Sequence, residues 1–221
     1  MKSIRESIDL ITHLFEMPFL FTTADDFGLG DPERNHREYV RLSGVPQETI
    51  FETETWKLAV STRPGLGEIF LLRKDTEVLT FYVKYKKIHI PGLGMAVTQV
   101  VIWRRDNPRF PNITSYVFFD YLLERFETIV SDAFQTQDGQ RFWINRMSEA
   151  VKRGLTVGLI DEGKIVPYDG SQSFDKWIET VGSHAWGDDS VHENRLFFIT
   201  KRKLQLTEAN LVPPSPGVAE R

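Results

Sequence analysis

The chain has 221 residues, a formal net charge of -4 and no cysteine. Without cysteine, the protein has no disulfide, no thiol nucleophile and no cysteine-ligated metal. The negative charge disfavours an unspecific nucleic-acid binder, because such proteins present a cationic face. A hydrophobic content of 41% and a charged content of 26% are ordinary for a soluble globular protein with one sizeable core.

Metal and membrane signals are weak throughout the sequence. The five histidines are scattered and none forms a His-x-x-x-His pair, so no metal site is predicted. We find no apolar segment long enough to span a bilayer and no apolar centre of a signal peptide. We therefore expect no membrane partner and a cytoplasmic location.

The N-terminal quarter has few regular patterns. Residues 3–16 predict an amphipathic helix, because apolar residues recur there at helical spacing. Residues 23–38 are polar and contain Gly and Pro, which favours a loop or a partly ordered segment, and residues 37–50 allow a short helix. We assign residues 1–54 to a helix-and-loop region packed on the core.

The next segment predicts an antiparallel meander. A first strand is expected at 55–61, and three strands rich in β-branched and aromatic residues follow at 67–75, 77–90 and 95–106. Turn residues separate these strands, including Pro91-Gly92-Leu93-Gly94 before the last one.

Beyond residue 106 the pattern alternates between helix and strand. The predicted order is helix 114–126, strand 128–132, helix 138–154, strand 155–161, helix 173–182 and strand 195–204. Together, residues 55–206 predict one mixed α/β (α+β) domain. Its single, mostly antiparallel sheet would have about six or seven strands flanked by helices. The Pro-rich residues 207–221 are expected to be disordered.

Polar side chains end the predicted strand 128–132. Ser131 and Asp132 lie at its carboxyl end, where open α/β sheets bind ligands. One interpretation places both residues in a reaction site. The other has Asp132 bonding to the backbone and fixing the turn into the next helix.

The start of that next helix is also polar. Thr136 or Asp138 is suited to cap its first turn. Phe142 and Trp143 are adjacent helical residues, so their side chains diverge by about 100 degrees. At least one of these two rings is expected in the core, and we assign Trp143 there.

Several short runs carry a resemblance to a known family: Tyr121-Leu122-Leu123, Ser131-Asp132, Gln135-Thr136, Gly139 and Phe142-Trp143. These runs and the element order resemble the GNAT superfamily of N-acetyltransferases, in particular the divergent GNAT-like proteins of bacteriophages. The resemblance covers residues 55–204 and is strongest over 114–161.

The resemblance implies a fold and an activity. In GNAT proteins the fourth and fifth strands, here 95–106 and 128–132, splay apart and hold acyl-coenzyme A between them. It therefore implies an acyl-coenzyme A-dependent N-acyltransferase that uses acetyl-CoA. The acceptor would be a small amine or a host protein, in the host cytoplasm for a phage-encoded chain.

Candidate site residues also follow from the resemblance. The cofactor-binding candidates end the fourth strand and begin the next helix: Ile102, Trp103, Arg104, Arg105, Arg109, Thr114 and Ser115. The fourth strand contains no carboxylate, so Asp132, Glu68 or a water chain remain alternatives for the base. Tyr168 or Tyr116 would be the acid, and Ser131 would line the site.

One departure from the family keeps a second hypothesis open. Active GNAT enzymes bind the cofactor pyrophosphate in a glycine-rich turn, where backbone N–H groups approach the phosphates. Residues 104–116 contain no glycine, and Pro108 and Pro111 each remove a backbone donor. The alternative is an inactive GNAT-like protein that binds and modulates a host protein.

Overall fold

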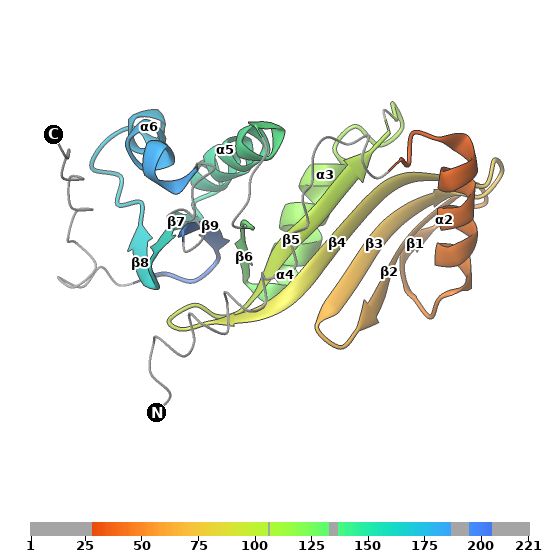
Figure 1. Cartoon of the computed structure of the whole chain (residues 1–221), viewed down its shortest axis with the longest axis horizontal. Helices are drawn as coiled ribbons and strands as arrows, with labels where there is room; N and C mark the ends of the chain where they lie inside the picture. Colours follow the sequence, from red (N-terminus) through yellow and green to blue (C-terminus); the bar gives the residue numbers. More distant parts are fainter. Residues whose placement is uncertain (1–27, 106, 133–136, 187–194, 205–221) are drawn as a thin grey trace, which may run out of the picture.

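A single open sheet dominates the molecule. The structure, a computed structural model, describes residues 28–105, 107–132, 137–186 and 195–204. Nine strands pair there in the order β1-β2-β3-β4-β5-β6-β9-β7-β8, and only β5 and β6 are parallel (Figure 1). The mixed α/β class and the mostly antiparallel sheet are confirmed. The predicted count of six or seven strands was wrong, because β1 and β8 were not recognised as strands.

The meander forms the long half of the sheet. Its strands are β2 (Trp56–Arg63), β3 (Leu66–Arg73), β4 (Val78–Ile90) and β5 (Gly94–Arg104), close to the predicted ranges. The edge strand β1 (Glu48–Glu52) pairs with β2. Between β4 and β5, Gly92 and Gly94 have φ of 85° and 76°, which glycine adopts at little steric cost.

Helix α2 (Pro32–Gly44) covers one face of the meander (Figure 1). Its first turn is capped by Asp31, whose side chain accepts a hydrogen bond from the Arg34 amide at 2.8 Å. The expectation of a loop at 23–38 was therefore wrong from Pro32 onward. Asp31 followed by Pro32 was the available signal, since proline is favoured in the first helical turn.

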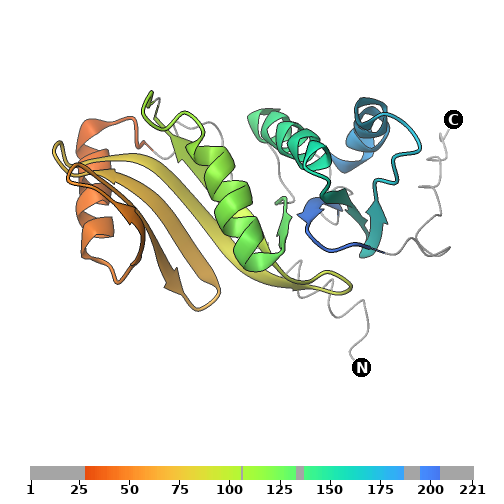
Figure 2. The same ribbon diagram turned by 180° about the vertical axis from the view of Figure 1, so that it is seen from behind.

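A continuous helical segment covers the opposite face (Figure 2). It comprises α3 (Ile113–Ser115), the π-helix η2 (Tyr116–Leu123) and α4 (Glu124–Phe126). The helix predicted at 114–126 is confirmed, but its middle is wound as a π-helix. The segment buries five apolar side chains: Val117, Phe118, Phe119, Leu122 and Leu123.

The remaining elements build the second half of the sheet. They are β6 (Thr128–Val130), α5 (Gln137–Lys152), β7 (Thr156–Asp161), β8 (Lys164–Pro167), α6 (Phe174–Ala185) and β9 (Arg195–Thr200). The last strand, β9, lies between β6 and β7. Ser173 caps α6, because its hydroxyl accepts a hydrogen bond from the Lys176 amide at 3.3 Å.

The main core lies between the sheet and the helices η2, α5 and α6. Trp143 is only 2% exposed and packs edge-on against Phe118, with ring centroids 5.7 Å apart, which confirms its core assignment. Asp138 lies in the first turn of α5 and pairs with Arg141. The other capping candidate, Thr136, and the helix predicted at 3–16 lie outside the described residues, as does the expected tail.

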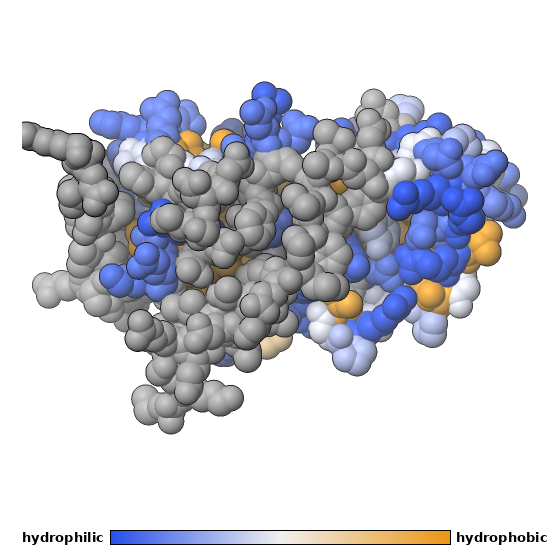
Figure 3. Space-filling model, viewed as in Figure 1, coloured by the Kyte–Doolittle hydropathy of each residue, from blue (hydrophilic) through white to orange (hydrophobic). Residues whose placement is uncertain are grey.

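The surface over α2 consists mainly of hydrophilic residues, with scattered hydrophobic ones (Figure 3). None of the helices in the described ranges combines the length and apolar character that a membrane crossing requires.

Candidate functional site

The parallel strands β5 and β6 separate soon after they pair. Their register contains only Val97 opposite Ile129 and Thr98 opposite Val130. At this point β5 carries a bulge. On β4, Tyr85 pairs with Gln99 of β5, whereas the preceding residue, Lys84, pairs with Val101, so one residue of β5 has no partner in β4. A bulge bends its strand and leaves one residue outside the ladder. Consequently β5 diverges from the short strand β6 (Figure 1).

Ser131 is fixed by hydrogen bonds at this separation. Its amide donates to the Phe197 carbonyl at 2.8 Å, and its hydroxyl accepts from the Phe197 amide at 3.0 Å. The hydroxyl of Thr98 donates to the Ser131 carbonyl at 3.3 Å. Ser131 therefore joins β6 to β9 and to β5, and these contacts explain why a buried serine stands here.

Asp132 follows directly and has unusual electrostatics. The residue is half-buried, and burial of its carboxyl group raises its pKa from 3.8 to about 8. Desolvation disfavours the charged form of a carboxyl group, so the proton is held up to near-neutral pH. Asp132 can therefore exchange a proton in the pH range in which general bases work.

Tyr168 lies beyond β8, against α6. Its hydroxyl donates to the Gln172 carbonyl at 2.6 Å, and its ring centroid lies 5.4 Å from that of Trp177. These contacts close the loop before α6. They engage the phenolic proton that an acid catalyst would have to give up.

The predicted cofactor residue Arg104 is exposed at the end of β5, and its positive charge acts on a residue of α5. Burial lowers the pKa of Arg146 on α5, and the positive charges of Arg153 and Arg104 lower it further, against the opposing effect of Glu149. Arg146 is paired with Glu149 at 2.9 Å. Its enclosed Nε has no hydrogen-bond partner within the described part of the chain.

The start of the helical segment faces the same helix. The hydroxyl of Ser115 donates to the Glu149 carboxylate at 2.8 Å, and Arg153 binds that carboxylate at 2.6 Å. Thr114, the neighbouring candidate, is half-buried. Arg104, Ser115 and α5 thus lie around one region, which contains several arginine side chains and the carboxylate of Glu149.

The other cofactor candidates lie elsewhere. Trp103 is buried in the cluster beneath α2, and Ile102 packs against the main core. Arg105 and Arg109 line a separate cavity of about 690 Å³ at the end of the sheet. The structure therefore divides the predicted set instead of gathering it around one ligand.

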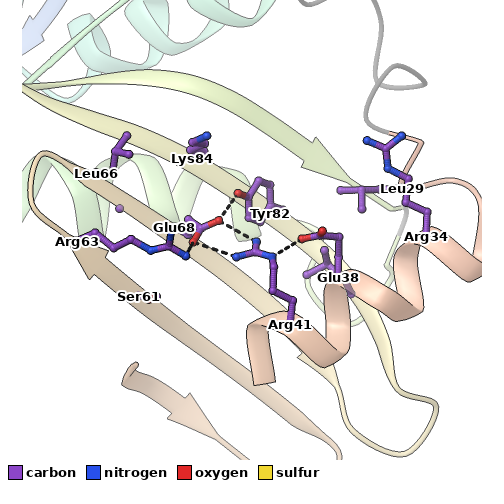
Figure 4. A pocket seen from close by; sticks show the side chains of 12 residues that line it. Leu29, Arg34, Glu38, Arg41, Ser61, Arg63, Leu66, Glu68, Tyr82 and Lys84 are labelled. Carbon is purple, nitrogen blue, oxygen red and sulfur yellow. Dashed lines mark hydrogen bonds and ion pairs between the residues drawn. The ribbon is translucent and has the colours of Figure 1, made fainter. Parts of the chain in front are cut away.

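A polar pocket of about 420 Å³ lies between α2 and strands β2 to β4 (Figure 4). At its floor Glu68, whose side chain is 12% exposed, accepts from the Tyr82 hydroxyl at 2.6 Å and from Arg41 at 2.8 Å. Arg63 lies 3.5 Å from the same carboxylate. Glu38 on α2 binds Arg41 at 2.7 Å (Figure 4).

These contacts keep Glu68 ionised. Burial would raise its pKa, but hydrogen bonds from Arg41 and Tyr82, together with the nearby positive charges, lower it overall. Sequence reasoning considered Glu68 only as a possible base and missed the pocket. Arg41, Glu68 and Tyr82 come from three separate elements, so no local spacing signals their contact.

Comparisons with known proteins add no relative. No protein-family model matches the chain, and no curated protein matches it.

Among the described residues, no three or more His, Asp or Glu side chains gather as a metal site.

Proposed function

We propose that this protein is a GNAT-like N-acyltransferase, related to those of bacteriophages, that uses acetyl-CoA to acetylate an amine. The observation that carries this proposal is the separation of parallel strands β5 and β6 directly before Asp132. In the family that the sequence resembles, such a separation between the fourth and fifth strands receives the acyl-coenzyme A. The meander followed by helix, strand, helix and strand supports the same reading.

The residues at the separation suit acyl transfer. Bound acetyl-CoA supplies an activated thioester. Asp132 accepts the proton that the attacking amine loses, because a base with a pKa near the working pH is effective. A C–N bond would form as the C–S bond breaks, and the proton taken up by Asp132 would pass through water to the leaving thiolate. A backbone N–H released by the bulge in β5 polarises the thioester carbonyl.

The coenzyme phosphates would lie between Arg104 and α5. Arg146 offers an enclosed Nε without a hydrogen-bond partner among the described residues, and a phosphate oxygen fits such a donor. Arg104 adds positive charge at the same place. Guanidinium groups would here replace the backbone donors that Pro108 and Pro111 remove from the turn.

The acceptor would enter from the pocket beneath α2. That pocket includes Lys84 on β4, and Lys86 lies two residues further along the same face. Lys86 is opposite Thr98, whose hydroxyl binds the carbonyl next to Asp132. The pocket and the separation of β5 and β6 are therefore connected along one face of the sheet.

Calorimetry with acetyl-CoA tests the proposal. We expect micromolar binding by the native chain and a loss of about tenfold or more for Arg104→Ala, since a charge-assisted contact is removed. The matched control is Arg105→Ala, which should bind as the native chain does. Absence of binding at millimolar ligand would contradict the enzyme proposal and favour the inactive, host-protein-binding alternative.

A further inference from the structure

The cavity at the end of the sheet has a cationic lining. It lies where β2 begins, β3 ends and the chain leaves β5, and its volume is about 690 Å³. Among the described residues, the charged ones of its lining are three arginines and one aspartate: Arg73, Arg105, Arg109 and Asp75. Three positive charges against one negative charge leave a formal excess of two.

The aspartate among these described residues, Asp75, is already paired. Arg73 binds Asp75 through two contacts of 2.9 and 3.1 Å. The guanidinium groups of Arg105 and Arg109 have neither a hydrogen bond nor an ion pair in the described ranges. The excess positive charge of the cavity therefore resides on these two side chains.

The turn that carries Arg109 also holds an unsatisfied donor. The Asn107 side-chain oxygen accepts from the Arg109 amide at 3.0 Å, which fixes the turn. Its Nδ2 is enclosed and has no acceptor in the described structure. A buried donor without an acceptor is unfavourable, so a ligand oxygen at this place would be stabilising.

We propose that this cavity binds a phosphate-bearing anion at a site separate from the proposed coenzyme site. Two uncompensated guanidinium groups match the charge of a phosphate dianion, and their planar forks suit its oxygens. Three threonines of the lining, Thr55, Thr76 and Thr80, place further polar side chains at the cavity. Arg104, the neighbour of Arg105, does not line it.

Titration with inorganic pyrophosphate in a calorimeter tests this site. The double variant Arg105→Gln/Arg109→Gln should bind at least about tenfold more weakly than the native chain. The control Arg63→Gln, at the pocket beneath α2, should stay within about twofold. Binding should also weaken with added salt.

Three results would overturn the proposal. They are unchanged pyrophosphate binding by the double variant, no binding by the native chain at millimolar pyrophosphate, and a similar loss in the Arg63→Gln control. Tryptophan emission shows separately whether the double variant is folded. If it is not, the pyrophosphate titration is repeated with the single variant Arg109→Gln, whose residue is exposed. Failure of the coenzyme proposal appears in the Arg104 variant with acetyl-CoA, so the two proposals fail independently. If the double variant also lost acetyl-CoA, the cavity would belong to the coenzyme site and the separate site would be rejected.

Discussion

Asp132 combines a position at a strand end with a proton that is held to near-neutral pH. Because its folded pKa of about 8 exceeds the ordinary aspartate value of 3.8, the folded state binds more protons than the unfolded state between these values. The contribution of Asp132 to stability is therefore fully present below about pH 4 and is lost as the pH rises through 8.

The substitution Asp132→Asn removes this pH dependence. Relative to the native chain, the variant should gain roughly 2–4 kcal/mol in unfolding free energy between pH 5 and pH 9, less than the full pKa shift because the residue is only half-buried. Urea unfolding at both pH values measures the difference. Parallel stability profiles would show that the Asp132 carboxyl titrates as an exposed group does.

Glu68 depends on its partners in a different way. When Arg41 is removed, the largely buried carboxylate of Glu68 keeps only two of these partners, the Tyr82 hydroxyl and the more distant Arg63. We expect Arg41→Ala to lower the unfolding free energy by about 1–2 kcal/mol, and the added change Glu68→Gln to recover part of it.

An exposed ion pair supplies the control for this experiment. Arg73 and Asp75 have side chains 45% and 40% exposed, so Arg73→Ala should leave stability unchanged within error. If Arg73→Ala lowered the unfolding free energy as much as Arg41→Ala does, burial would not explain the importance of the contacts between Arg41 and Glu68.

At the scale of elements, β7 depends on a glycine. A Cβ atom on Gly158 would lie 2.5 Å from the Val166 carbonyl oxygen and 2.6 Å from ring carbons of Phe198. Gly158→Ala should therefore lower the unfolding free energy by about 1–3 kcal/mol through overpacking between β8 and β9. The control Gly44→Ala has open space around the new methyl group and should be neutral or slightly stabilising. Equal stability of both variants by thermal unfolding would contradict the close approach at Gly158.

The sequence predicted some elements well and others not at all. Strands β3, β4 and β5 were recognised because β-branched and aromatic residues fill them and turn residues separate them. Strand β1 has a half-exposed, polar sequence at the sheet edge, and β8 has only four residues, so neither shows a regular alternation. The π-helical winding of η2 was not predicted, since its apolar stripe resembles that of an α-helix.

At the scale of the whole molecule, long-range pairing determines the candidate sites. The insertion of β9 between β6 and β7 brings Phe197 to Ser131, which is 66 residues away in the sequence. Likewise, the pocket beneath α2 joins Arg41 to Glu68 across 27 residues. Ser131 and Asp132 could be named as candidates from sequence because they end a strand, whereas contacts between distant elements leave no local signal.

The central claim is that acyl-coenzyme A binds where β5 and β6 separate. Hydrogen exchange measured by mass spectrometry, with and without saturating acetyl-CoA, tests it most directly. The claim predicts slower amide exchange in residues 98–104 and 128–132 when the ligand is present. Unchanged exchange in both segments, or slowing confined to the pocket beneath α2, would contradict it.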